Sequence, residues 1–283
     1  MVDINRSTSG VYLPEAVSGE ILAKVQEASV IQRVARRLAL PGNGTAVSII
    51  TGEPTASWVG ETEEKPVSNP TVSNKVLRPY KLAVIETFSN EFRRDLPALY
   101  SALADRLPAA LAKKFDTTAF HGTAPGSDFD TLAGAADSYL TYNGLVDVIS
   151  GLGADGYDFN GVVVAPQGEA ELLRIKDNDG RPIFIGDAAT ASGIGSVLGR
   201  PVFKNRSAYL NTTNDVLGFA GDWSQAIWGQ VGDVQIKISD QATLVSGEST
   251  INLFQQNMFA VLAEIEVGFR VSNTAAFRKL IAD

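Results

Sequence analysis

Apolar residues in the first part of the chain are spaced for a helix. Over residues 15–38 they recur every three or four positions, which predicts an amphipathic helix interrupted near Ser29. Residues 41–44 read Pro-Gly-Asn-Gly, a combination that ends helices. Residues 1–13 are polar, which favours an arm lying on another surface over a self-supporting element.

Two strand-like segments follow, separated by a long polar stretch. The β-branched residues 45–50 and the Val-, Ile- and Thr-rich residues 76–88 predict strands. The residues between them, 51–74, are polar and include Pro54, Pro66 and Pro70. Loops of this length are uncommon in a compact domain unless they are functional or disordered. We therefore expect this stretch to reach outward to a neighbouring molecule.

The longest predicted helix spans residues 95–121. Asp95 is a suitable N-cap, and Pro97 is tolerated in a first helical turn. Pro108 lies inside the helix and removes one backbone hydrogen bond, so we expect one element that is kinked or locally unwound there. The apolar stripe that predicts the helix consists of Leu96, Leu99, Leu103, Leu107, Leu111 and Phe115.

The second half of the chain alternates short helical and strand-like segments. A Gly-, Ser- and Asp-rich connection over residues 123–134 leads into it. No repeat of fixed period is visible. This order predicts an α+β protein. The expected helices are 145–152, 168–175 and 274–281, and the expected strands are 161–165, 216–219, 226–228, 234–238 and 257–271.

Composition narrows the classes of function. The 283 residues carry a net charge of −8, which argues against a broad basic face for binding nucleic acid. The sequence has no cysteine and one histidine, so it cannot form a disulfide framework and we expect no metal site and no cofactor. We find no secretory signal and no run of about 18 apolar residues, and we expect a soluble cytoplasmic chain with no membrane partner.

Two patterns imitate ligand sites. Residues 193–199 are glycine-rich like a phosphate loop, but no convincing strand precedes them and Pro201 interrupts any helix that should follow. Asp177, Asp179 and Asp187 lack the terminal bidentate acid of an EF-hand calcium loop. The sequence favours a plain loop in the first case and a turn in the second.

Two further groups concern catalysis and DNA. His121 with Asp116 and a serine would make a hydrolase triad, but no nucleophile elbow accompanies them, and we expect no enzyme acting on a small molecule. Arg33, Arg36 and Arg37 form a small basic cluster. Such clusters are usually solvated faces, and this one is also the best local candidate for touching DNA.

Several short phrases lie in a fixed order along nearly the whole chain. In this order they resemble the tailed-bacteriophage major capsid protein family, whose members have the Hong Kong 97-type fold. Each phrase is weak alone, and the order carries the resemblance. The phrases are Leu13-Pro14-Glu15, Ala28-Ser29-Val30-Ile31, Trp58-Val59-Gly60-Glu61-Thr62-Glu63-Glu64-Lys65-Pro66, Arg78-Pro79-Tyr80-Lys81-Leu82-Ala83, Ser89-Asn90-Glu91, Lys114-Phe115-Asp116, Ala119-Phe120-His121-Gly122, Lys176-Asp177, Gly180-Arg181-Pro182, Leu198-Gly199-Arg200-Pro201-Val202, Gly221-Asp222-Trp223 and Ala276-Phe277.

The resemblance implies a division of the chain. An extended loop would lie over a neighbouring subunit, and the loops of an axial domain would meet at five- and six-fold positions. The implied segments are an N-terminal arm and helix (1–38), the extended loop with flanking strands (39–91), a peripheral domain with a spine helix (92–134), the axial domain (135–250) and a return to the peripheral domain (251–283).

The same resemblance implies a structural subunit. Copies would assemble in the host bacterial cytoplasm, as hexamers and pentamers, into the icosahedral virion head that encloses the phage double-stranded DNA. A portal protein and a decoration protein would be partners, and DNA contacts would be weak and non-specific. Because Met1 stands directly at the arm, with no long scaffolding segment before it, we expect a separate scaffolding protein or none.

Some members of that family fasten their shell with an isopeptide bond, and the resemblance extends to its three residues. Lys65 would attack the Asn257 amide of another subunit, with Glu264 as helper. Lys65 would have to be neutral, and Glu264 would accept a proton in a water-poor contact between subunits. The alternative is a surface lysine, a strand-end asparagine and a solvated glutamate. The apolar neighbours that suit the reaction are Val261, Leu262 and Ile265.

Two other functions stay open at this point. An encapsulin-like shell uses the same architecture to enclose a protein cargo, and its contents distinguish it from a phage head. An intracellular α/β enzyme would use the glycine-rich residues 193–199 and would be a stable monomer that binds a ligand.

Overall fold

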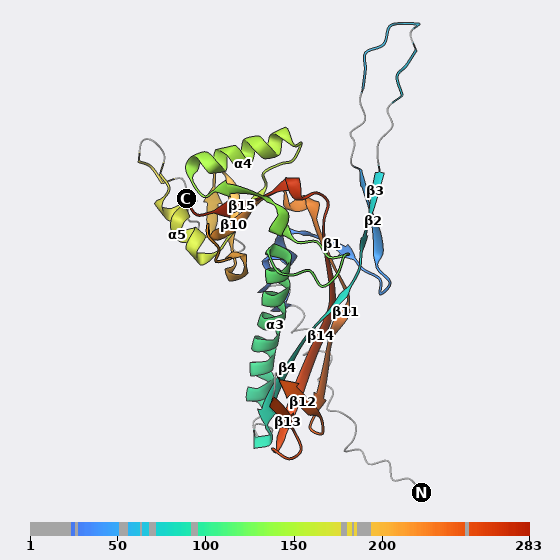
Figure 1. Ribbon diagram of the computed structural model, residues 1–283, viewed down its shortest axis with the longest axis vertical. Coiled ribbons are helices and arrows are strands. Elements are labelled where there is room, and N and C mark those ends of the chain that lie inside the picture. The colour runs from blue at the N-terminus through green and yellow to red at the C-terminus, as the bar shows by residue number, and fades with distance from the viewer. Residues whose placement is uncertain are drawn as a thin grey trace.

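The molecule is elongated and has three parts (Figure 1). The structure is a computed structural model, and it describes residues 24–25, 28–50, 56–62, 64–67, 72–91, 96–176, 180–182, 184–185, 194–246 and 249–283. A long helix runs beside a sheet of long strands, a second sheet with two helices lies at one end of them, and a two-stranded hairpin projects from the body.

Helix α3 (Leu96–Phe120) is the long helix that the leucine stripe predicts. Leu107, Leu111 and Phe115 are buried along it. The helix runs through Pro108 without interruption, so the prediction of one element is confirmed, and the helix is not unwound at the proline. Burial of Leu107, Leu111 and Phe115 outweighs the cost of the proline, which is about 3 kcal/mol in a helix interior.

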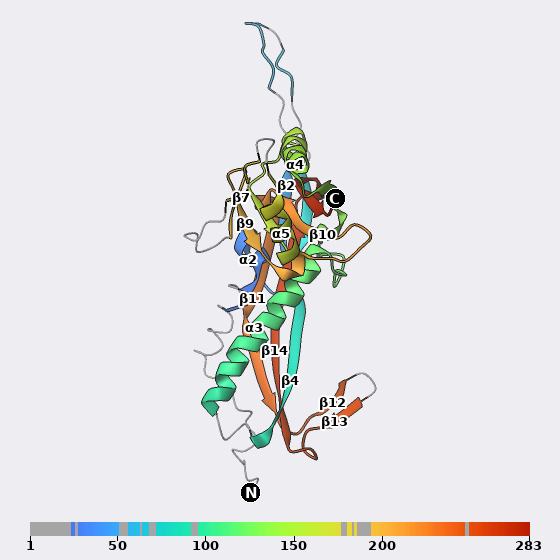
Figure 2. The same ribbon diagram turned by 90° about the vertical axis from the view of Figure 1, so that its left-hand side faces the viewer.

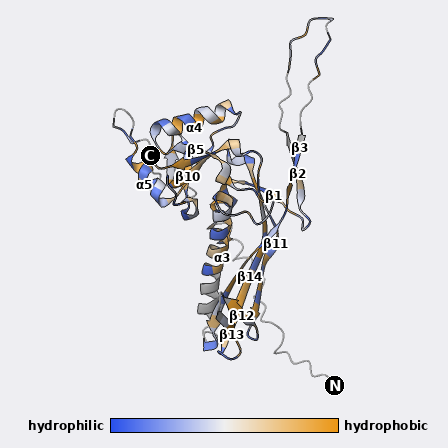
Figure 3. Ribbon diagram, in the orientation of Figure 1, coloured by the Kyte–Doolittle hydropathy of each residue, from blue (hydrophilic) through white to orange (hydrophobic). Residues whose placement is uncertain are grey.

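The helix packs on a four-stranded sheet with the order β1–β11–β14–β4. Along β14, Val261 and Ile265 are buried and Leu262 and Glu264 are partly exposed. This period of two is expected for a strand with one face on a core. Figure 3 shows the same alternation as mixed colours along these strands. The strands are β1 (Arg36–Ala39), β4 (Tyr80–Ser89), β11 (Ala226–Ser239) and β14 (Met258–Val271).

A seven-stranded sheet, with the order β5–β15–β10–β6–β9–β8–β7, builds the second part. Its central strand β6 is buried along its whole length, as expected when both faces are covered. The helices are α4 (Tyr142–Ala154) and α5 (Pro166–Arg174), and the strands are β5 (Ala136–Tyr139), β6 (Gly161–Val164), β7 (Phe184–Ile185), β8 (Gly195–Val197), β9 (Arg200–Lys204), β10 (Val216–Gly221) and β15 (Phe277–Ile281). Short 3-10 helices are η3 (Leu132–Gly134), η4 (Arg206–Ala208), η5 (Trp223–Gln225) and η6 (Thr274–Ala276).

Two hairpins lie at opposite ends of the body (Figures 1 and 2). Strands β2 (Thr45–Ile50) and β3 (Val72–Leu77) pair antiparallel and lead to the described loop residues 56–62 and 64–67, which contain neither helix nor strand and are largely exposed. Strands β12 (Thr243–Ser246) and β13 (Ser249–Asn252) form the other hairpin. The described part of the long polar stretch is therefore an extension of the body.

The first predicted helix is partly wrong. Helix α2 (Val30–Val34) begins after Ser29, whose hydroxyl accepts a hydrogen bond from Gln32 N, so the predicted interruption is confirmed. Residues 36–39 are strand β1, paired in parallel with β11, and the helical prediction up to Leu38 is wrong. Pairing with a strand far along the chain outweighs the local periodicity.

The predicted C-terminal helix is also wrong. Only η6 is helical there, and β15 pairs with β10 and β5. Phe277, Leu280 and Ile281 are buried. The spacing of these three residues fits a helix equally well. The register of β10 shifts between Val216 and Gly218, opposite this strand, and the shift disturbs the alternation of buried and exposed residues along β15.

Strand β11 joins two segments that the sequence separates. It covers both predicted strands, 226–228 and 234–238, with a register shift between Val231 and Gln235 opposite β14. β11 lies in the four-stranded sheet, whereas β15 lies in the seven-stranded sheet. The chain therefore crosses between the two sheets more than once.

Candidate functional site

Lys65 lies in the loop beyond β2 and β3 and is exposed. Two apolar side chains near it are also exposed, Trp58 at 103% and Val67 at 84% of their full accessible areas. Large apolar side chains in that state mark a surface that another molecule covers. Along the sequence, the exposed lysine therefore lies between two exposed apolar side chains.

Asn257 lies in the turn just before β14, at the end of the body that carries β12 and β13. It is exposed and has a left-handed φ of 53°, which asparagine tolerates better than most residues. Asn90, just after β4, donates from Nδ2 to Asn257 Oδ1 at 2.8 Å and from its backbone N to Asn257 O at 2.9 Å. Phe254 in the same turn is 78% exposed.

Glu264 lies in the interior of β14, on the face of the sheet directed away from α3. It forms an ion pair with Lys237 at 3.6 Å and borders a polar cavity of about 250 Å³. Of the three apolar neighbours in sequence, Leu262 shares its face, whereas Val261 and Ile265 are buried on the opposite face. The carboxylate is thus accessible from outside the sheet.

One chain does not bring these three residues together. Glu264 lies six strand positions beyond Met258, a distance of roughly 20 Å. The loop that carries Lys65 and the hairpin β12–β13 beside Asn257 lie at opposite ends of the molecule in both views (Figures 1 and 2). Any contact among these residues has to form between copies of the chain.

The three arginines do not form one patch. Arg36 and Arg37 are successive residues of β1 and therefore point to opposite faces of the sheet. Arg37 lies over the Trp228 ring at 5.5 Å, and Arg33, on α2, lies over the Phe203 ring at 5.7 Å. All three are exposed.

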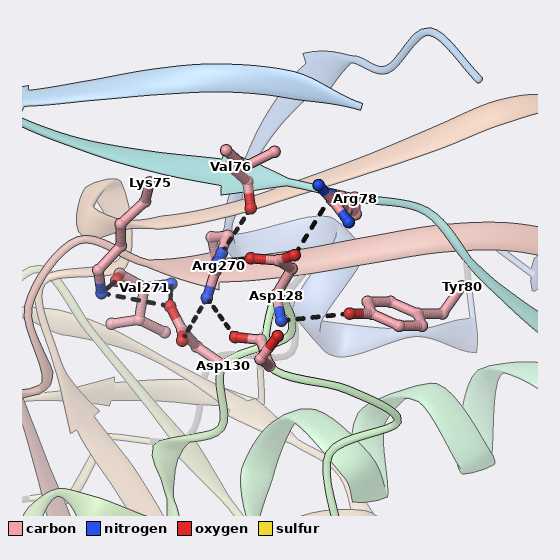
Figure 4. Close-up of polar contacts among 9 residues, drawn as sticks. Lys75, Val76, Arg78, Tyr80, Asp128, Asp130, Arg270 and Val271 are labelled. Atoms are coloured by element: carbon pink, nitrogen blue, oxygen red, sulfur yellow. Dashed lines mark hydrogen bonds and ion pairs between the residues drawn. The ribbon is translucent and has the colours of Figure 1, made fainter. Parts of the chain in front are cut away.

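A network of charged groups that the sequence analysis missed holds the root of the β2–β3 hairpin (Figure 4). Arg270 of β14 is buried, and its guanidinium donates to Asp128 at 2.6 Å, to Asp130 at 2.8 Å and to the Val76 carbonyl at 2.8 Å. A charge in this position is stable only with such partners. The available signal was an arginine whose two neighbours in sequence, Phe269 and Val271, are apolar.

Residues of β3, of β4 and of the connection between them complete the network. Lys75 Nζ donates to the Val271 carbonyl at 2.7 Å and pairs with Asp130 at 3.3 Å. Arg78 pairs with Asp128 at 3.3 Å, and Tyr80 Oη accepts from Asp128 N at 3.2 Å. The loop 123–134, β14 and the hairpin are therefore fastened to one another at a single place.

Asp116 of α3 is a second buried group whose role the sequence did not reveal. Its carboxylate accepts from Ser29 Oγ at 2.6 Å, Val30 N at 3.0 Å, Ile31 N at 3.4 Å and Asn205 Nδ2. Burial raises the pKa of Asp116 to about 6, although these four donors favour its charged form. The carboxylate joins α2 to the long helix.

The remaining candidate sites have structural roles where they are described. His121 Nε2 hydrogen-bonds the Ser207 carbonyl at 2.9 Å. Gly195–Val197 is strand β8, and Leu198 and Gly199, both with positive φ, form the two-residue turn to β9. The described part of the glycine-rich segment is therefore a hairpin, and the prediction of a plain loop is partly wrong. Asp177, Asp179 and Asp187 lie outside the described residues.

The described residues contain neither a metal-binding group nor a membrane-spanning helix. No group of three or more His, Cys, Asp or Glu side chains there is arranged to hold a metal ion. None of the helices in that part of the chain has the length and apolarity to cross a bilayer.

Comparison with known proteins gives one consistent result. The model of the Phage capsid family matches residues 9–281. The chain is 31% identical to the probable major capsid protein gp17 of Mycobacterium phage D29, over 94% of this chain and 88% of that protein. It is 29% identical to the probable major capsid protein gp17 of Mycobacterium phage L5, over 95% of this chain and 89% of that one.

A solved chain from Mycobacterium phage Adephagia superposes with a TM-score of 0.70 over 90% of each chain, at 20% identity. This similarity, taken with the family match, confirms the predicted Hong Kong 97-type fold. All the phrases that carry the sequence resemblance lie within the matched residues. The chain belongs to the phage capsid family.

Proposed function

We propose that this chain is the major capsid protein of a tailed phage, and that its copies assemble as hexamers and pentamers into the icosahedral head around double-stranded DNA. The observation that carries the proposal is the family match over residues 9–281. The projecting hairpin supports it, because a loop with uncovered apolar side chains is suited to contact another copy.

The two sheets support a division into domains. We assign the four-stranded sheet with α3 to the peripheral domain and the seven-stranded sheet with α4 and α5 to the axial domain. The hairpin β2–β3 is the extended loop. On this assignment β11 belongs with the peripheral domain and β15 with the axial domain, a refinement of the linear boundaries expected from sequence.

We further propose that the shell is fastened by an isopeptide bond between Lys65 and Asn257 of different copies. Neutral Nζ of Lys65 attacks Cγ of Asn257, the new C–N bond forms, the Cγ–Nδ2 bond breaks and ammonia leaves. Glu264 accepts the proton from Nζ and returns it to the departing Nδ2. Since Glu264 lies roughly 20 Å from the start of its own β14, it comes from a different copy than Asn257.

Exposed apolar groups on both sides of this contact support the chemistry. Trp58 and Val67 flank Lys65, and Phe254 shares the turn of Asn257. Their mutual burial would contribute roughly 1.5–3 kcal/mol for each side chain. It would also exclude water, and loss of hydration disfavours the charged form of an amine, so the neutral amine that the attack requires is favoured.

The test is denaturing gel electrophoresis of particles purified by size and viewed by negative-stain microscopy. Uniform shells are expected, with a ladder of linked subunits above the monomer band near 30.1 kDa. Shells with a single monomer band would overturn the cross-link and leave the capsid function standing. A monomer that forms no particles, even when co-expressed with its scaffolding protein, would overturn the capsid function.

Lys65→Arg separates assembly from cross-linking. Arginine keeps the charge and the reach but supplies no usable neutral amine, so particles should form and the ladder should disappear. Lys176→Arg, an exposed lysine elsewhere, is the matched control and should keep the ladder. A ladder that persists in Lys65→Arg would remove Lys65 from the reaction.

The contents of the particles distinguish a phage head from an encapsulin-like shell. We propose packaged DNA, held by weak contacts that include Arg33 and whichever of Arg36 and Arg37 faces the interior. A portal protein, a separate scaffolding protein and a decoration protein are the further partners proposed. Nuclease-resistant DNA in purified particles would support a phage head. A protein cargo without DNA would instead support an encapsulin-like shell.

A further inference from the structure

The amide that would be attacked already has a hydrogen-bond donor on its oxygen. Asn90 Nδ2 lies 2.8 Å from Asn257 Oδ1. This contact joins the residue after β4 to the residue before β14, where the two strands pair through Ser89 and Met258. It exists within one chain, whereas Lys65 and Glu264 have to arrive from other copies.

The reaction places a negative charge on that oxygen. When Lys65 Nζ adds to Cγ, the Cγ–Oδ1 double bond opens and Oδ1 becomes an oxyanion in the tetrahedral intermediate. The double bond re-forms when Nδ2 leaves as ammonia. A donor that is already in place and lies 2.7–3.1 Å from such an oxygen stabilises the charge without reorganisation, which is how oxyanion holes act.

We propose that Asn90 is a catalytic residue of the cross-linking reaction, in which its Nδ2–H stabilises the oxyanion that forms on Asn257 Oδ1. This inference rests on the cross-link proposed above. It adds a residue that neither the sequence analysis nor the family resemblance assigned a role. Lys65 is then the nucleophile, Glu264 the proton carrier and Asn90 the oxyanion donor.

The surroundings hold the donor in position. The Asn90 backbone N donates to Asn257 O at 2.9 Å, so the two residues are joined at main chain and side chain together. Asn90 Oδ1 is buried and has no partner among the described residues, so the interaction with Asn257 is the one that orients the amide group. Asn257 itself adopts a left-handed φ of 53° in the turn that precedes β14.

The experiment compares the growth of the ladder in wild-type particles and in two Asn90 variants, sampled at intervals after induction and quenched in denaturant. Asn90→Asp has the same shape but offers a carboxylate in place of the donor, and Asn90→Ala removes the group altogether. We expect both to form shells and to cross-link at least about tenfold more slowly than wild type, with Asn90→Asp the slower of the two.

A matched control separates the donor from the added charge. Gln256→Glu places an equal negative charge in the same exposed turn and leaves Asn90 intact, so it should cross-link at close to the wild-type rate. Asn257→Asp should give shells with no ladder, because a carboxylate does not undergo the attack. Slowing in Gln256→Glu equal to that in Asn90→Asp would attribute the effect to charge and overturn the inference.

The experiment distinguishes failure of the proposed role of Asn90 from failure of the proposed cross-link. A ladder that grows at the wild-type rate in both Asn90 variants overturns the role of Asn90 and leaves the cross-link standing. A wild-type shell that gives no ladder overturns both. If Asn90→Asp does not assemble, the rate in Asn90→Ala decides, since alanine removes the donor without introducing a charge.

Discussion

The core of the body and the loop at the projecting hairpin differ in the exposure of their apolar side chains. In the body, Phe115 and Phe269 are almost fully buried and meet edge to face at 6.3 Å between ring centroids. In the loop, Trp58 and Val67 are almost fully exposed. The core of the body buries its aromatic rings within one chain, whereas Trp58 and Val67 in the loop can be covered only by a second copy. Stability of the chain and stability of the shell therefore depend on different residues.

The largest effect should come from the core of the body. Phe269→Ala removes a fully buried ring that contacts Phe115 and Phe129, and should lower the free energy of unfolding of the unassembled chain by about 3–5 kcal/mol. Phe254→Ala, at an exposed ring, should change it by less than about 0.5 kcal/mol. Urea denaturation measures both, and equal losses would remove the distinction between the two regions.

The network at the hairpin root should come next. Arg270→Met removes the group that bridges Asp128, Asp130 and the Val76 carbonyl. We expect a loss of about 3 kcal/mol, near the low end for a broken buried pair, because Lys75 and Arg78 remain beside the two aspartates. Arg174→Ala breaks an exposed i,i+3 pair and should cost less than about 0.5 kcal/mol in the same denaturation experiment.

Asp116 should make the stability of the body depend on pH. Its pKa rises from 3.8 to about 6 on folding, so the native state binds this proton more tightly than the unfolded chain does. The contribution of this group to stability is therefore largest below pH 4 and falls as pH rises towards 7. The free energy of unfolding of wild type minus that of Asp116→Asn should fall by up to about 3 kcal/mol across this window. A difference that stays constant with pH would contradict it.

The smallest effect on the chain should come from the loop. Trp58→Ala should leave the unassembled chain within about 0.5 kcal/mol of wild type, because the indole contacts nothing that its removal would expose. The shell should nevertheless dissociate at lower denaturant concentration, by roughly 1.5–3 kcal/mol per buried indole. Light scattering during a urea titration follows this dissociation. Unchanged shells would show that Trp58 stays exposed after assembly.

Local pattern was sufficient where a segment packs through its own periodicity. The leucine stripe predicts α3, and the prolines and polar residues of 51–74 predict an extension outside the body. The same rules failed for β1 and β15, since both are short edge or inserted strands whose partners are distant in sequence. Their apolar spacing is compatible with a helix and does not identify the partner.

The candidate site was accessible from sequence only by resemblance. The resemblance to the family implies Lys65, Asn257 and Glu264, and nothing else in the sequence gives a physical reason to connect them. Asn90 was part of a matched phrase without a role, because its meaning depends on the pairing of β4 with β14. Arg270 and Asp116 show their importance only when burial and partners are known.

The position of the hairpin tip depends strongly on the orientation of the hairpin at its root. Residues 45–77 contain about 16 residues on each side, so the tip can reach up to about 50 Å from the root. A rotation of about 5° at Arg270 would displace the tip by about 4 Å, far more than the tolerance of about 1 Å that a covalent reaction allows. A rigid network at Arg270 restricts the range of positions that the loop tip can occupy. Binding to the neighbouring copy then has to fix the position of Lys65 to within the distance that the reaction tolerates.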